Sequence, residues 1–128
     1  MESKIKITPF EDGIIISISG DLDSLRVMSY RSLILEEIDR YYVRSILWDF
    51  SNLSFLDSSG IGLILGRYNE IRRIGGICGI TGLTPYTRKI IQMTGLFSIL
   101  SEYQDIETFK RKVKVKIWTK WNFVLMLP

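Results

Sequence analysis

Two adjacent serines, Ser58 and Ser59, are the residues in this sequence with the clearest capacity for chemistry. They lie behind Asp57 and ahead of Gly60 in the stretch SFLDSSGIGLILGRY. Serines in such a turn can serve as a nucleophile, as a phosphate acceptor, or as the cap of the helix that follows. A nucleophile elbow has the spacing G-x-S-x-G, and neither serine has a glycine two residues before it. The 128-residue chain also contains no histidine, which excludes Ser-His and Cys-His catalysis.

The glycines of the same stretch do not form a nucleotide-binding motif. Gly60, Gly62 and Gly66 give G-x-G-x-x-x-G, whereas the dinucleotide fingerprint is G-x-G-x-x-G and a P-loop ends in G-K-S/T. With one cysteine and no histidine, the usual zinc sites are excluded as well. We therefore expect a protein that is not an enzyme, with no catalytic residue, no metal and no cofactor. A serine hydrolase or a nucleotide-binding enzyme is the remote alternative.

The residues after Asp57 predict a helix that begins at the serines. Apolar residues recur with helical spacing at 61, 64, 65, 68 and 71, and glycines at 75 and 76 end the helix. A serine is a common N-cap, and Asp57 suits the positive end of the helix dipole. A helix N-terminus also accommodates a phosphate, which adds about −1.5 to −2 charges. Capping and phosphate acceptance are therefore compatible, and phosphorylation would repel a partner that fits a small neutral serine.

Two further glycines give this helix a surface of unusual shape. Gly62 and Gly66 lie four residues apart, on the same side of the helix and beside Leu63 and Arg67. Each glycine lowers helix stability by about 1 kcal/mol relative to alanine. The pair would leave a flat strip on which the backbone of a partner can approach closely. Alternatively, the small residues pack against a neighbouring element of the same chain.

The remaining segments predict an α/β domain with a small mixed sheet flanked by helices. Residues 3–10 and 14–20 alternate like paired strands around a turn, and 44–51 and 76–81 are short apolar strands. Residues 21–42 have helical spacing, with Asp23 or Ser24 as the N-cap. Segment 84–95 has Thr84, Pro85 and Gly95 as start and stop signals. We also predict a last strand at 96–100 and a final helix within 101–112.

The C-terminal tail differs in charge from the rest of the chain. Residues 1–106 contain 11 basic and 13 acidic side chains, a net charge of −2, whereas residues 107–128 contain 6 basic residues and Glu107, a net charge of +5. The body shows no nucleic-acid footprint, so we expect no nucleic-acid partner. KVKVKIW alternates like a strand and FVLMLP is apolar, and we expect an ordered extension that packs on the body or on another copy. The alternatives are a frayed or non-native end, or membrane-surface contact through lysines and tryptophans.

Other features favour a cytoplasmic protein. Cys78 is the single cysteine, which fits a reducing compartment. The N-terminus MESKIKITPF lacks the apolar core of a signal peptide, and the longest apolar runs are too short to span a bilayer. We therefore expect a soluble protein with no membrane partner.

Three stretches, LSFLDSSGIGLILGRYNEIRRIGG, the upstream SGDLD and the downstream MTGLFSIL, carry a family likeness. Together they resemble the STAS-domain anti-sigma factor antagonists, and within that family the anti-sigma-F factor antagonists of endospore-forming bacteria. The resemblance extends over residues 3–109 and implies a single STAS domain at 1–109, with a mixed β-sheet flanked by helices. Residues 110–128 are left as a basic and apolar extension without an assigned role.

The resemblance implies a partner-switching regulator. In this family the unphosphorylated antagonist binds an anti-sigma factor that is also a serine kinase, and so releases the sigma factor. The kinase phosphorylates the first serine after the aspartate, here Ser58, and phosphorylation ends binding. A separate, metal-dependent serine phosphatase restores the active form. A STAS module of a different partner-switching pathway, serving the stress response, is the alternative.

The family's docking surface combines this turn, the start of the following helix and the upstream GDLD turn. The implied partner-binding residues are Asp21, Asp23, Asp57, Ser58, Ser59, Gly60, Gly62, Leu63 and Arg67. Asp23 is equally suited to be the cap of the first helix. Asp21 stands where the family often has glutamate, a mild change that does not touch the phosphorylation site.

Overall fold

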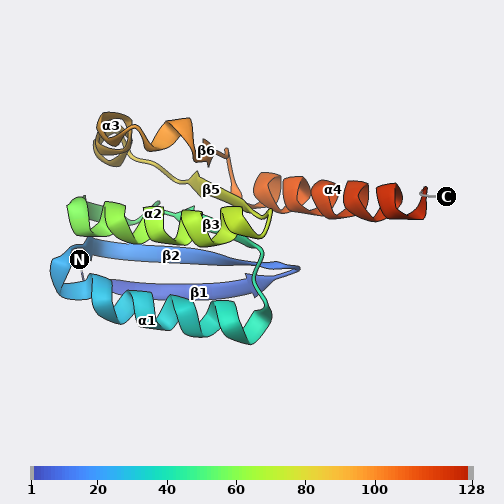
Figure 1. Ribbon diagram of the computed structural model, residues 1–128. Helices are drawn as coiled ribbons and strands as arrows, with labels where there is room; N and C mark the ends of the chain where they lie inside the picture. The colour runs from blue at the N-terminus through green and yellow to red at the C-terminus, as the bar shows by residue number, and fades with distance from the viewer. Residues whose placement is uncertain (1, 127–128) are drawn as a thin grey trace.

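Strands and helices alternate along most of the chain (Figure 1). The computed structural model describes residues 2–126, except for the side chains of residues 120, 121, 123 and 124. The strands are β1 (Lys4–Phe10), β2 (Gly13–Leu22), β3 (Ser45–Asp49), β4 (Leu53–Leu56), β5 (Ile77–Thr81) and β6 (Ser101–Glu102). The helices are α1 (Ser24–Tyr41), α2 (Ser58–Arg73), α3 (Pro85–Thr94) and α4 (Ile106–Leu125), with a 3-10 turn η1 (Leu96–Ser98).

The strands form a six-stranded mixed sheet, which confirms the predicted α/β class. Its order is β1-β2-β3-β5-β6, and β4 also pairs with β2. β1 and β2 form an antiparallel hairpin, whereas the other pairs of neighbouring strands are parallel. β2 has ten residues, so its first half pairs with β3 and its last residues, from Gly20 to Leu22, pair with β4. The four-residue β4 is absent from the strands predicted above.

Successive residues of the central strands pack on opposite faces of the sheet. Ile14 of β2 belongs to the main core, beneath α1 and α2. The next residue, Ile15, belongs to a smaller cluster on the other face, together with Phe109 and Val113 of α4. Helices therefore cover both faces, which explains why the parallel strands are apolar almost without interruption.

Segment 96–100 was predicted to be a strand, and this prediction is wrong. Gly95 adopts a left-handed conformation with φ of 75° and is followed by the 3-10 turn η1. Leu96 and Leu100 are both buried, and the amide of Leu100 donates to the carbonyl of Leu96 at 2.8 Å. The turn thus buries both leucines on one side, and the last strand is β6, whose Ser101 pairs with Gly79 of β5.

The alternating tail KVKVKIW is helical, which corrects the predicted strand. Phe109, Val113 and Ile117 are spaced four residues apart, and in a helix this spacing puts them on one face against the sheet. The helix α4 is continuous, so the predicted boundary between residues 109 and 110 falls inside it. Of the apolar end FVLMLP, the side chains of 123 and 124 and all of 127–128 lie outside the described residues. Across the described chain, no helix has both the length and the apolar character that a bilayer crossing requires.

Cys78 lies in the main core, and its burial predicts an unreactive thiol. Burial raises the pKa of this thiol to about 12. The reactive thiolate is therefore scarce at neutral pH, and access is blocked by packing. We expect an aromatic disulfide reagent at pH 8 to leave the native protein unmodified and to label one thiol per chain after denaturation. Rapid labelling of the native protein would contradict this placement of Cys78.

Candidate docking and phosphorylation site

Two helices begin side by side where two neighbouring parallel strands end. The last residues of β2 and β4, Leu22 and Leu56, are paired in register. The amide of Asp57 donates to the carbonyl of Leu22 at 3.4 Å, which ties the start of α2 to the end of β2. Asp23 and Asp57 occupy equivalent positions, one residue after each strand, and cap α1 and α2. The DSSG turn and the GDLD segment at the end of β2 thus lie at the same edge of the sheet, where the resemblance implies a common docking surface.

Asp57 is the N-cap of α2, so the prediction of a serine cap is wrong. Its Oδ1 accepts hydrogen bonds from the amides of Ser59 at 2.9 Å and Gly60 at 3.2 Å. Aspartate is as good a cap as serine, and its charge adds a favourable interaction with the helix dipole. Ser58 and Ser59 become the first two residues of the helix. Ser58 is exposed, and its hydroxyl is not needed to start the helix.

Gly60 lies beneath this turn and allows the helix to approach the strands. It is buried, and a Cβ at this position would lie 2.6 Å from Leu56 Cδ1 and 2.8 Å from Leu22 Cγ. The carbonyl oxygen of Leu22 would be 3.0 Å away, and as backbone it has little freedom to move. The glycine of DSSG is therefore required for packing, and its contribution to a docking surface is indirect.

The outer face of α2 carries a row of accessible positions that begins at Ser58. Ser58, Gly62, Leu65 and Asn69 share this face by helical spacing, and we call them the switch stripe. A Cβ added at Gly62 or at Gly66 would have no atom within 4 Å, so neither glycine packs against another element of the described chain. Leu65 is 40% exposed, although its spacing predicted a common helical face with Ile64 and Ile71, which are buried. Its spacing of seven residues from Ser58 was the signal that could have identified it.

Leu63 and Arg67 lie on the opposite side of α2, facing the body of the protein. Leu63 is 3% exposed and Arg67 is 4% exposed, although both were predicted to contact a partner. The Arg67 Nη2 donates to Glu70 Oε1 at 2.6 Å, and its buried Nε has no hydrogen-bond partner among the described residues. Each successive helical residue is rotated by about 100°, so residues that follow exposed glycines turn inward. In this structure the two side chains support the switch stripe from beneath.

The two upstream aspartates have different roles in the local structure. Asp23 Oδ1 accepts from the amide of Leu25 at 3.2 Å, and Oδ2 pairs with Arg26 Nη1 at 2.7 Å. Asp23, and not Ser24, is therefore the cap of α1. The amide of Asp21 donates to Ser3 Oγ at 2.9 Å, at a shift in the pairing of β2 with β4 where Gly20 has φ of 76°. Both side chains are half-buried beside the start of α2.

The chain is similar to known proteins over most of its length. The model of the STAS domain family matches residues 5–114. The anti-sigma F factor antagonist of Paenibacillus polymyxa is 33% identical over 105 residues, which are 82% of this chain and 90% of the relative. The anti-sigma F factor antagonist of Lysinibacillus sphaericus is 37% identical over 83 residues, which are 65% of this chain and 71% of the relative.

A solved structure with the same fold leads to the same family. The anti-sigma factor antagonist SpoIIAA in its unphosphorylated form gives a TM-score of 0.72 at 31% identity, and the match covers 86% of this chain and 95% of that one. The phosphorylated form of SpoIIAA, a Bacillus cell fate determinant, gives 0.66 at 31% identity, with coverage of 86% and 98%. With a family match over residues 5–114 and relatives above 30% identity, the chain belongs to the STAS domain family and, within it, to the anti-sigma factor antagonists.

Proposed function

We propose that this chain, in its unphosphorylated form, binds an anti-sigma factor that is also a serine kinase, and that phosphorylation of Ser58 ends this binding. The observation that carries the proposal is the position of Ser58. It is exposed at the first residue of α2 and lies on the same outer face as Gly62, where open space allows a partner to approach closely. The relatives named above are antagonists of anti-sigma F factors, which supports a partner of that class.

Phosphorylation at this position would change the surface without disturbing the fold. A phosphate adds about −1.5 to −2 charges and three strong hydrogen-bond acceptors. The N-terminus of α2 tolerates an anion because of its amides and dipole. A partner that packs on the neutral stripe would instead meet a bulky dianion beside Asp57. The similarity of this chain to both the unphosphorylated and the phosphorylated form of SpoIIAA supports release without unfolding.

The docking surface that we infer has an outer and a supporting set of residues. Ser58, Ser59, Gly62 and Leu65 would contact the partner directly, with Asp21, Asp23 and Asp57 at the border. Gly60, Leu63 and Arg67 would act by holding α2 in place, because their positions are buried. This division revises the implied surface by adding Leu65 and by giving three residues an indirect role.

The catalytic groups of the cycle would belong to other proteins. The kinase would transfer the phosphoryl group to Ser58, and a separate serine phosphatase would remove it. The chain would serve as substrate and as regulator of transcription through a sigma factor, not as an enzyme. We place the cycle in the cytoplasm, where sigma factors and RNA polymerase act.

A kinase assay with mass spectrometry tests the phosphorylation site. Incubation with the anti-sigma kinase and ATP is expected to add the mass of one phosphoryl group to the wild-type protein and to Ser59→Ala. The Ser58→Ala protein should remain unmodified yet still bind the kinase in a pull-down, because alanine keeps the stripe small and neutral. Modification of Ser58→Ala would move the site to Ser59. An unmodified wild-type protein would overturn the proposal.

A stress-response pathway with a different anti-sigma factor is the alternative. The same surface would operate in both cases, since the chemistry of the switch is shared. The identities of 33% and 37% to anti-sigma F factor antagonists favour an anti-sigma F factor as the partner. Binding assays against both kinds of anti-sigma factor would separate the two.

A further inference from the structure

The last part of α4 extends beyond the sheet and leaves large apolar side chains in solvent (Figure 1). Ile117 is the last described residue of the helix that packs against the second cluster. Beyond it Trp118 is 67% exposed, and Leu125 and Met126 are 79% and 83% exposed. The family match ends at residue 114, so the α4 extension, residues 115–126, lies outside the matched domain. Several exposed apolar residues on one projecting helix mark an interaction site.

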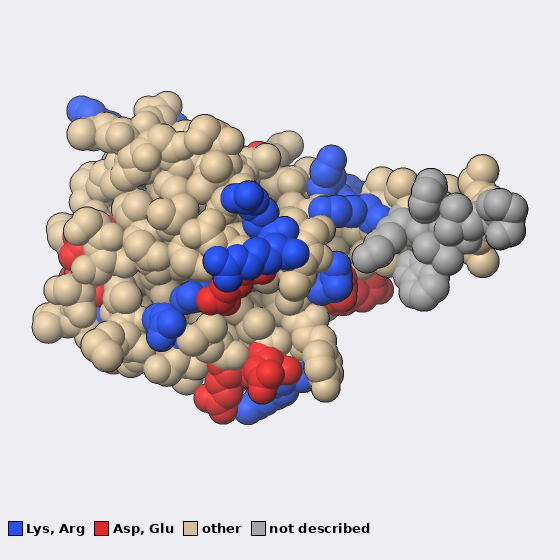
Figure 2. Space-filling view, viewed as in Figure 1, with Lys and Arg blue, Asp and Glu red and all other residues tan. Residues whose placement is uncertain are grey.

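The part of α4 around the start of this extension is rich in basic side chains. Figure 2 shows Lys and Arg gathered where α4 leaves the body. The basic residues of this part of α4 are Lys110, Arg111, Lys112, Lys114 and Lys116. Their spacing distributes them over the sides of the helix that do not pack against the sheet, whereas the side of Phe109, Val113 and Ile117 has no cation among them.

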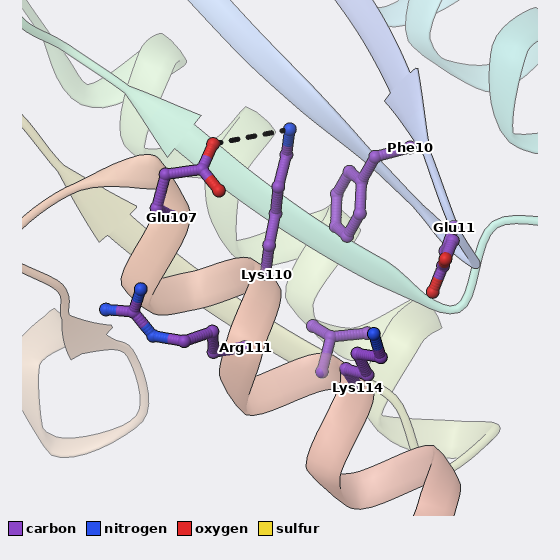
Figure 3. Close-up of a pocket in the computed structure, with 7 residues that line it drawn as sticks. Phe10, Glu11, Glu107, Lys110, Arg111 and Lys114 are labelled. Carbon is purple, nitrogen blue, oxygen red and sulfur yellow. Dashed lines mark ion pairs between the residues drawn. The ribbon is translucent and has the colours of Figure 1, made fainter.

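Lys110, the first of these cations, forms an ion pair within α4, whereas Lys112, Lys114 and Lys116 form none with the residues that the structure describes. Figure 3 shows Lys110 between Glu107 and Phe10, with its Nζ 3.8 Å from Glu107 Oε1 and 5.8 Å from the centre of the Phe10 ring. This is the one ion pair on α4 among the described residues. Lys112, Lys114 and Lys116 are exposed, and their charges are available to an external anion.

We propose that the α4 extension binds the surface of an anionic lipid bilayer, which replaces the expectation from the sequence that the protein has no membrane partner. Lysines attract anionic headgroups, tryptophan favours the boundary between headgroups and acyl chains, and leucine and methionine enter the apolar layer. The order of the exposed side chains along the helix matches this gradient, since Lys112, Lys114 and Lys116 come before Trp118, and Leu125 and Met126 lie at the end. Lys120 lies between Trp118 and Leu125 in the sequence. The end of the extension would enter the bilayer surface without spanning it, because no described helix is long and apolar enough to cross a bilayer.

The charge and composition of the α4 extension argue against two other binding partners, a second copy of the chain and a nucleic acid. Packing of two copies through α4 would bring two sets of six basic residues together, which opposes close association. A nucleic acid would satisfy the lysines but would leave Trp118, Leu125 and Met126 without an apolar environment. An anionic bilayer satisfies both kinds of side chain at once.

Attachment through α4 would leave the switch stripe accessible. In Figure 1 the first turns of α1 and α2 lie at the end of the molecule opposite the projecting part of α4. A protein held by α4 would therefore present Ser58 away from the bilayer. The two surfaces can be tested separately.

Vesicle co-sedimentation of the full chain tests this proposal. We expect binding to vesicles of phosphatidylcholine with phosphatidylglycerol, little binding to phosphatidylcholine alone, and loss of binding between about 0.1 M and 0.5 M salt. The variant Lys112→Glu/Lys114→Glu/Lys116→Glu should bind at least about tenfold more weakly. The matched control Lys4→Glu/Lys6→Glu/Lys89→Glu changes three exposed lysines of β1 and α3 by the same charge and should bind within about twofold of wild type. Trp118→Ala should weaken binding with no change in charge.

Several outcomes would overturn the proposal. One is failure to sediment with anionic vesicles while the circular dichroism and thermal melt show a folded protein. Another is equal loss in both charge variants, which would indicate non-specific attraction by the whole chain. Concentration-dependent dimers that disappear in Trp118→Ala would assign the extension to a second copy. Binding to duplex DNA as tight as binding to anionic vesicles would assign it to nucleic acid.

Discussion

Replacing Ser58 by glutamate is expected to weaken binding of the anti-sigma kinase by about a hundredfold or more and to leave stability nearly unchanged. A charge placed in a docked interface against groups that fit a neutral residue costs several kcal/mol, and 1.4 kcal/mol corresponds to about tenfold in affinity. Asp57 lies next in the chain and already uses its carboxylate to cap the helix, so a glutamate at Ser58 would add a second negative group beside it.

The same substitution should be tolerated by the folded chain itself. Ser58 is exposed, and a carboxylate in the first turn interacts favourably with the helix dipole by about 0.3–1 kcal/mol. Repulsion from Asp57 offsets part of this gain, so the free energy of unfolding should change by less than about 0.5 kcal/mol. Binding would be measured by calorimetry and stability by urea denaturation.

Two control variants make this result specific. Ser58→Ala should bind within about threefold of wild type, because it is small and neutral. Thr8→Glu adds the same charge at an exposed position of β1, away from the switch stripe, and should also bind normally. If Ser58→Glu bound as tightly as Ser58→Ala, the charge at Ser58 would not be the switch.

Local signals explain which parts of the fold the sequence predicted well. The start of α3 at Thr84 and Pro85 and its end at Gly95 are confirmed, because capping residues act within one turn of the helix. The helix after Asp57 and the hairpin of β1 and β2 are confirmed for the same reason, since their periods are unambiguous. These signals need no knowledge of the rest of the chain.

Features that depend on tertiary contacts were harder to predict. In KVKVKIW, Val113, Val115 and Ile117 fit a strand, while Val113 and Ile117 also fit a helix. Val113 and Ile117 both pack with the smaller apolar cluster around Ile15 and Phe109. Val115 is 60% exposed, as expected in a helix, because a strand would put all three side chains on one face. Local alternation cannot reveal which surface is available to cover an apolar side chain.

At the candidate site, too, features set by local sequence were predicted well, and features set by tertiary contacts were not. The sequence located the DSSG turn and the accessible glycines, because these follow from residue type and spacing. It did not identify the side of α2 that faces the strands. Leu63 and Arg67 were therefore assigned to the surface, and Leu65 was grouped with Ile64, which is buried. One turn of a helix holds residues of both kinds, and the packing of Gly60 on Leu22 and Leu56 sets the rotation of α2.

Alanine at Gly60 and alanine at Gly62 are expected to change stability in opposite directions. At Gly60 the new methyl group would collide with Leu56, Leu22 and the Leu22 carbonyl. Overpacking of this kind costs about 1–3 kcal/mol, which exceeds the gain of about 1 kcal/mol in helix propensity. The free energy of unfolding should therefore fall by up to about 2 kcal/mol. At Gly62 the methyl group meets no atom within 4 Å, so the propensity gain of about 0.5–1 kcal/mol should appear in full.

The affinity of Gly62→Ala for the kinase distinguishes a role of Gly62 in docking from a role in stability. Gly62→Ala should bind the kinase at least about tenfold more weakly while being the more stable protein, because its methyl group would occupy the space that the partner's backbone needs. Urea denaturation with a constant slope would measure stability, and calorimetry would measure affinity. A stabilised Gly62→Ala protein with wild-type affinity would show that the outer face of α2 is not the docking surface. Destabilisation of Gly62→Ala would show instead that this glycine is packed within the chain, as Gly60 is.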